Sequence, residues 1–137
     1  MMAKTMVYQA IVLPTIMYGS ETWTWLKKDE SGINAVEMRS LRRMCGKRII
    51  DRVRNEQIRE ECNVRVGVVT KMKVNKLRWF GHVERMSEER LTRKIYVISL
   101  PRTCVQNGMN VNEAKEVCRD RGSWRSVLSA YPSWDAA

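Results

Sequence analysis

The chain has 137 residues, a usual length for a single domain, and 44% of them are hydrophobic, which is enough for a buried core. It carries 25 Lys and Arg against 15 Asp and Glu, a formal net charge of +10. This charge predicts an anionic partner, nucleic acid first and an anionic membrane surface second; a solvated basic surface without a specific partner is the plain alternative.

The N-terminal apolar stretch MVYQAIVLPTIMYG is too short to span a bilayer. It also lacks a basic leader and a small-residue cleavage site. We therefore expect an intracellular protein, in the nucleus or cytoplasm, that is neither secreted nor inserted in a membrane. The four cysteines include no CxxC pair, so we expect free thiols rather than a disulfide framework: Cys45, Cys62, Cys104 and Cys118.

In chain order, the first predicted helix covers residues 2–13. Pro14 should kink or restart it, because proline has no N–H to donate and clashes with the preceding turn. A turn follows, with Gly19 available for an unusual backbone conformation. The second helix runs from residue 29 to 45, and Gly46 is its stop signal.

A short third helix begins at Asn55, whose side chain is suited to cap it. The fourth helix spans residues 66–86. Gly81 lies inside it and costs about 1 kcal/mol relative to alanine, so the helix is open to a break there.

Residues 95–100, IYVISL, could form one short strand, followed by loop signals. Asn110 and Glu113 form a capping-box pattern that starts another helix, and Gly122 separates this helix from a final short turn. The fold class is therefore mainly α, with five or six helices. We expect a thumb-like helical region at 1–86, an irregular linker at 87–109 and a C-terminal tail helix at 110–131.

The sequence offers little for catalysis. His82 is the one histidine, and no cysteine lies near it to be activated as a nucleophile. The closest two cysteines are fourteen residues apart, without the close pairs that structural zinc sites use. We expect no catalytic residue, no metal and no cofactor.

Basic residues carry the stronger signal, as two runs that are almost free of acids. One run begins in the second predicted helix and continues into the segment after it. The other run lies in the fourth predicted helix. Arg39, Arg42 and Arg43 share one helix flank, where successive cations could meet successive phosphates. The predicted nucleic-acid-binding residues are Arg39, Arg42, Arg43, Lys47, Arg48, Lys71, Lys73, Lys76 and Arg78.

The stretch LRWFGHVERM, residues 77–86, concentrates aromatic and basic side chains. Helical periodicity predicts a buried face of Leu77, Phe80 and Val83, with Arg78 and Arg85 outside it. Trp79 is expected in the core, with stacking on a nucleic-acid base as the alternative.

Four segments, in order, resemble the region downstream of the polymerase core in reverse transcriptases of LINE-type (non-long-terminal-repeat) retrotransposons: AIVLPTIMYGSETWT, KKDESGINAVEMRSLRRMCG, DRVRNEQIRE and KLRWFGHVERM. MNVNEAKEVCRDRGSWRSVLSAYPS resembles the C-terminal tail of insect versions. The likeness implies a thumb and the linker behind it, which grip a template–primer duplex through its backbone. It implies structural motif positions at Leu13, Pro14, Tyr18, Gly19, Glu21, Trp23, Trp79, Gly81 and His82.

Polymerisation in that family uses paired aspartates and two metal ions, and this chain contains no Asp-Asp pair. A basic segment usual in the family between RKIY and the tail is also missing, as though deleted. The resemblance therefore implies a non-catalytic fragment with at most weak, sequence-nonspecific binding to the RNA or DNA backbone. A small helical module that binds a protein partner through exposed apolar surface, and a translated remnant without function, remain alternatives.

Overall fold

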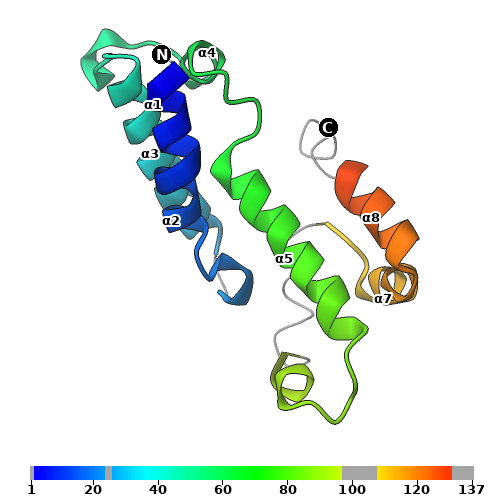
Figure 1. The fold of residues 1–137 in the computed structure, drawn as a ribbon. Coiled ribbons are helices and arrows are strands. Elements are labelled where there is room, and N and C mark those ends of the chain that lie inside the picture. Colours follow the sequence, from blue (N-terminus) through cyan, green and yellow to red (C-terminus); the bar gives the residue numbers. More distant parts are fainter. Residues whose placement is uncertain (1, 24–25, 97–107, 131–137) are drawn as a thin grey trace. The chain divides into compact units, whose positions relative to one another are not determined.

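The computed structural model describes residues 2–23, 26–96 and 108–130, and these residues form helices without any strand (Figure 1). This confirms the prediction of a small, mainly α fold. Residues 95–96 of the predicted strand lie in a helical segment, 91–96, and the rest of the predicted strand lies outside the described residues.

The elements are α1 (Met2–Val7), the π-helical η1 (Tyr8–Val12), α2 (Leu13–Met17), the 3-10 turn η2 (Ser20–Thr22), α3 (Lys27–Met44), the 3-10 turn η3 (Ile49–Asp51), α4 (Asn55–Glu61), α5 (Val68–Glu84), α7 (Val111–Arg119) and α8 (Arg121–Ala130).

Two compact units make up the chain. The first, here the N-terminal unit, comprises residues 1–20 and 25–71; the second, the C-terminal unit, comprises 21–24 and 72–137. The α5 helix begins in the N-terminal unit and continues in the C-terminal unit. Each unit has its own cluster of buried apolar side chains.

The first helical run changes its hydrogen-bonding pattern just before Pro14. Residues Tyr8–Val12 form a π-helical turn, and α2 restarts at Leu13 with Pro14 in its first turn. A proline lacks the N–H that would continue an α-helix and crowds the carbonyl of the preceding turn, so the wider turn accommodates it. The predicted restart at Pro14 is confirmed, and Gly19 follows with φ +67°.

The core of the N-terminal unit packs the first helical run and α4 against α3. Its buried members are Tyr8, Met38, Leu41, Ile58, Cys62 and Val64. Glu37 is fully buried among these elements and binds three of them. Its carboxylate accepts hydrogen bonds from the Tyr8 hydroxyl at 2.7 Å, the Arg59 guanidinium at 2.7 Å and the Val68 N–H at 2.9 Å. One side chain of α3 thus ties together η1, α4 and the start of α5.

The segment between α3 and α4 departs from one sequence prediction. Gly46 does end α3, with φ +66°. The N-cap of α4, however, is Arg54, and the Asn55 side chain does not cap the helix. Asn55 Oδ1 instead accepts a hydrogen bond from Arg42 at 2.9 Å. The Asn55 side chain therefore links the start of α4 to α3 and does not cap its own helix.

Cys45 and Cys62 also link α3 to α4. Their Sγ atoms lie 3.0 Å apart, and both are free thiols, as is Cys118; Cys104 lies outside the described residues. Burial, followed by the neighbouring Cys45, raises the pKa of Cys62 to about 12. The prediction of free thiols is thus confirmed for these three cysteines.

In the C-terminal unit, α5 packs against α7 and α8. The buried cluster joins Leu77 and Phe80 of α5 to Ala114, Cys118, Trp124 and Leu128. The indole of Trp124 donates to the Leu77 carbonyl at 3.2 Å, which fixes α8 beside α5. Val83 is buried as well, so the predicted buried face is confirmed.

Gly81 does not break α5; it makes room for Trp124. A Cβ at this position would meet the indole Nε1 of Trp124 at 2.3 Å. The close approach of the two helices therefore requires a residue without a side chain, which is a packing reason for a glycine inside a helix.

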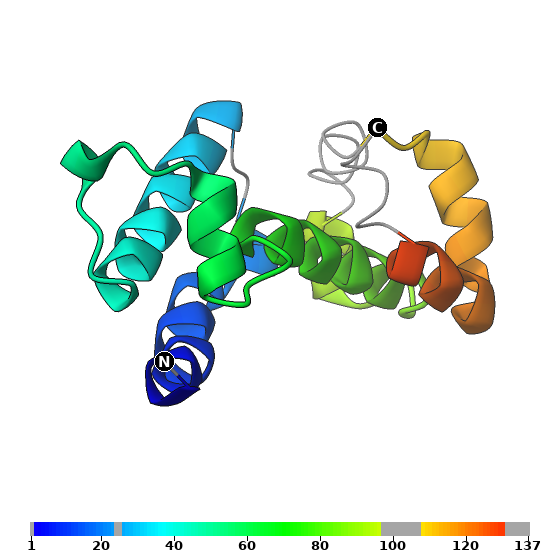
Figure 2. The same cartoon turned by 90° about the horizontal axis from the view of Figure 1, so that it is seen from above.

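The last two helices, α7 and α8, meet at a change of direction (Figures 1 and 2), and Asp120 is the residue between them. Asn110 caps α7, because its Oδ1 accepts from the Asn112 N–H at 3.0 Å. Gly122 lies inside α8 instead of separating two elements, and the predicted short turn is a helix of ten residues. Asp120 accepts from the N–H and the hydroxyl of Ser123 and so stabilises the first turn of α8. Among the described residues, no helix has both the length and the apolar character needed to cross a bilayer.

Glu37→Gln should lower the free energy of unfolding by about 3 kcal/mol, because it removes one partner of a buried ion pair and turns an amide donor toward the Arg59 guanidinium. Urea unfolding measures the loss. Glu60→Gln on the exposed side of α4 is the matched control and should stay within about 0.5 kcal/mol of the wild type. Equal stability of the two variants would contradict the central role of Glu37.

Gly81→Ala should destabilise the protein by about 2 kcal/mol, because the new methyl group overlaps the Trp124 indole. Gly32→Ala is the control, since a Cβ there meets nothing within 4 Å; it should raise stability by about 1 kcal/mol through helix propensity. Thermal unfolding followed by circular dichroism compares the two, and a shift of the same sign in both would argue against the close packing.

Candidate nucleic-acid interface

The structure separates the three arginines predicted to share one flank of α3. Arg39 and Arg43 are exposed and lie one turn apart. Arg42 is turned into the packing with the next segment, where its guanidinium donates to the Val53 carbonyl at 2.7 Å and to Asn55. Two of the three cations therefore face solvent, and the third has a structural contact.

After α3, the basic run continues through Lys47 and Arg48. Arg48 is exposed and Lys47 partly so. Asp51 is the one acid in this run, and its carboxylate accepts from the Arg48 N–H at 2.6 Å, across the 3-10 turn η3. Neither Lys47 nor Arg48 forms a side-chain ion pair within residues 2–23, 26–96 and 108–130.

The basic run on α5 is divided by burial. Lys71 and Lys73 are partly exposed, and Arg78 is exposed. Lys76, however, is only 4% exposed and donates to the Trp23 carbonyl at 2.6 Å. Burial lowers the pKa of Lys76 below its ordinary value. As placed, the Lys76 ammonium holds Trp23 to α5 and is not available to a phosphate.

The motif positions near residue 20 have mixed environments. Tyr18 is 84% and Trp23 is 49% exposed, while Glu21 is partly buried. The side chains of Tyr18 and Trp23 are therefore open to solvent. Tyr18 precedes the turn at Gly19, and the carbonyl of Trp23 is bound by Lys76.

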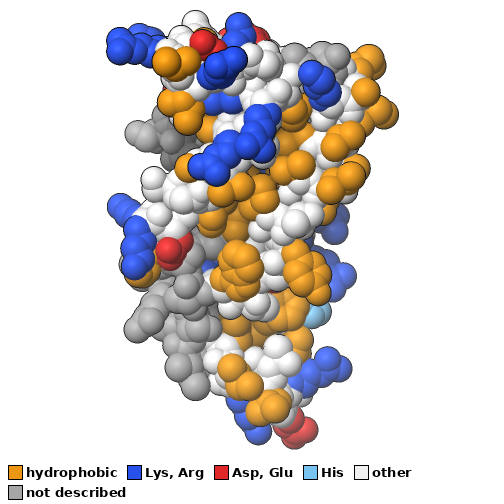
Figure 3. Space-filling model, turned by 90° about the vertical axis from the view of Figure 1, so that its left-hand side faces the viewer, with side chains coloured by type: hydrophobic (Ala, Val, Ile, Leu, Met, Phe, Trp, Pro, Cys, Tyr) orange, Lys and Arg blue, Asp and Glu red, His pale blue; other side chains and the backbone are white. Residues whose placement is uncertain are grey.

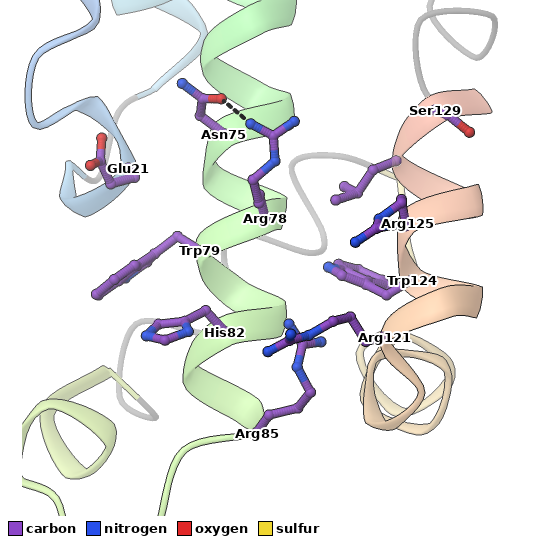
Figure 4. A pocket seen from close by; sticks show the side chains of 11 residues that line it. Glu21, Asn75, Arg78, Trp79, His82, Arg85, Arg121, Trp124, Arg125 and Ser129 are labelled. Atoms are coloured by element: carbon purple, nitrogen blue, oxygen red, sulfur yellow. Dashed lines mark hydrogen bonds between the residues drawn. The ribbon is translucent and has the colours of Figure 1, made fainter.

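A cavity of about 830 Å³ lies within the C-terminal unit, between α5 and α8 and beside Glu21 (Figure 4). Four arginines line it: Arg78 and Arg85 from α5, and Arg121 and Arg125 from α8. Figure 4 shows the arginines of α8 pointing toward α5, around the buried Trp124. Among the described residues that line it, Glu21 is the one carboxylate.

None of the four arginines forms an ion pair with a carboxylate in the described part of the chain. Arg85 donates to the Cys118 carbonyl at 2.7 Å, and Arg78 donates to Asn75 Oδ1 at 3.3 Å. These neutral acceptors orient the guanidinium groups and leave their charge uncompensated. Such a cluster attracts an anion, because mutual repulsion of the cations is relieved when one binds.

Trp79 and His82 line the same cavity from the side of α5 that lies away from α8 (Figure 4). Trp79 is partly exposed, so the expectation of a core tryptophan holds only for part of its surface. Its ring lies 5.4 Å from the ring of His82 and 6.5 Å from that of Tyr96, edge-on to the latter. His82 is exposed.

Sequence reasoning missed three members of this cluster. Arg78 and Arg85 are two helical turns apart and so lie on one face of α5, a signal that could have added Arg85 to the binding residues. Arg121 and Arg125 are likewise one turn apart on α8. The two pairs face the same cavity because Trp124 packs on Gly81. No local sequence pattern predicts this contact.

Among the described residues, no group of three or more His, Cys, Asp or Glu side chains is placed to hold a metal ion. Figure 3 shows Lys and Arg side chains at several places on one face of the molecule, among exposed apolar side chains and few acidic ones.

Comparison with known proteins gives a match to a protein from a mobile element. The chain is 32% identical, over 89 residues, to an uncharacterized transposon-derived protein of Caenorhabditis elegans. The match covers 63% of this chain and 32% of the relative, so the chain spans about a third of that protein's length. No protein-family model matches, and no solved structure matches. The likeness supports a transposon-derived origin.

The stability advantage of the wild type over Lys76→Met should grow as the pH rises from about 7 toward 10. The lowered pKa of Lys76 means that the unfolded chain binds the proton more tightly in this range, so the free energy of unfolding rises with pH until the unfolded lysine also titrates. Urea unfolding of the wild type and of Lys76→Met at several pH values measures the difference between their free energies of unfolding. The contributions of the other titrating groups are common to both proteins and cancel in this difference. A constant difference for Lys76→Met would contradict its burial as a cation.

Proposed function

We propose that this chain is a remnant of a LINE-type retrotransposon reverse transcriptase, without catalysis of its own, that binds RNA and DNA backbones weakly and without sequence preference. The observation that carries the proposal is the set of exposed arginines without carboxylate partners in the described residues, on a chain of net charge +10. Cations placed in this way neutralise phosphates and release counterions, which is the main source of non-specific affinity for nucleic acid.

The origin rests on two lines of support. The match to a transposon-derived protein supports an origin in a mobile element. The ordered motifs from AIVLPTIMYGSETWT to KLRWFGHVERM resemble the thumb and linker of reverse transcriptases and narrow the proposal to that class. The absence of catalysis is part of the proposal because the sequence has no Asp-Asp pair to hold two metal ions.

A second candidate function has its own observation. The first helical run exposes Met2, Met6 and Ile11 at 85%, 69% and 61%. Beside them, a cavity of about 390 Å³ within the N-terminal unit is lined by apolar side chains that include Val7 and Met44. Exposed apolar surface of this kind favours a protein partner, so a helical protein-interaction module is the alternative.

Binding of a labelled RNA–DNA duplex should weaken steeply between about 50 and 200 mM salt. The double substitution Arg39→Ala, Arg43→Ala should reduce the slope of log affinity against log salt by about 2, because each lost phosphate contact contributes about 0.9. Fluorescence anisotropy measures both quantities.

The matched control is Lys27→Ala, Lys28→Ala, which removes two exposed cations from the start of the same helix. We expect the slope of this variant to stay near that of the wild type. Absence of binding at low salt, or binding that is indifferent to salt, rejects the proposal. Salt-indifferent capture of a protein partner that Met6→Asp abolishes would favour the alternative.

A further inference from the structure

We propose that the cavity between α5 and α8 binds single-stranded RNA or DNA, with its arginines on backbone phosphates and Trp79 stacked on a base. The inference rests on the proposed function and gives it a substrate class and a second location, separate from the cations of α3. It is carried by the cavity of the C-terminal unit, three of whose four arginines, Arg85, Arg121 and Arg125, are not among the binding residues predicted from the sequence.

The size and spread of the charge favour a chain of phosphates over one small anion. A cavity of about 830 Å³ is far larger than an inorganic phosphate and falls within the range of organic-ligand sites. Arg78 and Arg85 are seven residues apart, about 10 Å along α5, and Arg121 and Arg125 are about 6 Å apart along α8. Cations spread over such lengths can each meet a different phosphate, whereas a single phosphorylated side chain would use only one or two.

Hydrogen bonds hold two of the four arginines in place before any ligand arrives. The Cys118 carbonyl orients Arg85, and Asn75 orients Arg78. Trp124, 2% exposed, locks α8 against the Leu77 carbonyl and so fixes the helix that carries the other two arginines. A site that is built in advance loses less entropy when it binds, and guanidinium groups suit phosphate oxygens in particular.

The aromatic side of the cavity argues for a single strand. Trp79 is partly exposed, with ring contacts only to His82 and Tyr96 among the described residues. Trp79 lines the same cavity as the arginines but lies across α5 from those of α8, so a strand that crosses α5 at Arg78 could place its phosphates on the arginines and a base on the indole. Proteins bind single strands with such combinations of cations and aromatic rings, because every unpaired base has a face to stack. In a duplex the base faces are stacked on one another and cannot reach the indole.

The test measures binding of labelled oligo(dT) and oligo(U) of about 12 nucleotides, and of a duplex of equal length, to the full chain. Arg121→Ala, Arg125→Ala should weaken oligonucleotide binding by about tenfold or more and reduce its salt slope by about 1.4, at about 0.7 for each lost phosphate contact. Duplex binding should fall less. The matched control is Arg90→Ala, Lys94→Ala, which removes two exposed cations of the same unit outside the cavity and should change oligonucleotide binding little.

Trp79→Leu and Trp79→Phe test the stacking. The phenylalanine variant should retain most of the oligonucleotide affinity and the leucine variant should lose about tenfold, because only the former keeps an aromatic face. Circular dichroism establishes that each variant is folded. If the leucine variant does not fold, the arginine pair on the exposed face of α8 still decides the question.

Each outcome bears on one proposal. If the duplex binds with salt dependence but the cavity variant binds oligonucleotides like its control, the single-strand site is rejected and the proposed function stands. If neither probe binds at low salt, the proposed function itself is rejected. If a phosphorylated peptide at equal phosphate concentration displaces the oligonucleotide completely, the cavity belongs to a phosphoprotein partner, and the single-strand site is overturned.

Discussion

The N-terminal unit depends on the buried carboxylate of Glu37. A buried charge is costly unless it is paired and hydrogen-bonded, and Glu37 meets both conditions through Tyr8, Arg59 and the Val68 N–H. Burial and the adjacent carboxylate raise the pKa of Tyr8, so the tyrosine remains a donor. Because its partners come from η1, α4 and α5, the charge favours one arrangement of these short helices. Apolar side chains alone would leave that arrangement less sharply specified.

The C-terminal unit reaches its stability differently, and the difference explains why it can carry a charged cavity. Its core is apolar and centres on Trp124, which packs on Phe80 with ring centroids 5.6 Å apart and fits over Gly81. Apolar packing and the Trp124 indole hold α8 to α5, so few charged groups take part in this contact. The arginines beside Trp124 therefore stay unpaired with carboxylates in the described residues, and the same contact that closes the core brings them to one cavity.

Sequence reasoning succeeded where a single helix decides the outcome. Periodicity placed Leu77, Phe80 and Val83 in the core, and the stop at Gly46 and the restart at Pro14 follow from local backbone chemistry. It failed where a distant residue competes for a side chain. Asn55 has a good capping side chain but bonds to Arg42, and Gly81 looked like a weak point of a helix because its partner lies 43 residues further along the chain. The cavity was out of reach for the same reason, since only tertiary packing joins its two arginine pairs.

The net charge of +10 therefore overstates what is available to a partner. Several cations bind carbonyl oxygens or carboxylates of the chain itself and stabilise its fold: Arg42, Arg59, Lys76 and Arg93. Their contribution to binding is limited to the long-range field, which salt screens over about 8 Å at physiological ionic strength. Among the cations that solvent reaches, the two proposals rest on Arg39 and Arg43 of α3 and on the four arginines of the cavity. Because direct phosphate contacts need a cation that solvent can reach, affinity should follow the accessible cations and not the total charge. The two units should therefore differ in the form of nucleic acid that each can hold.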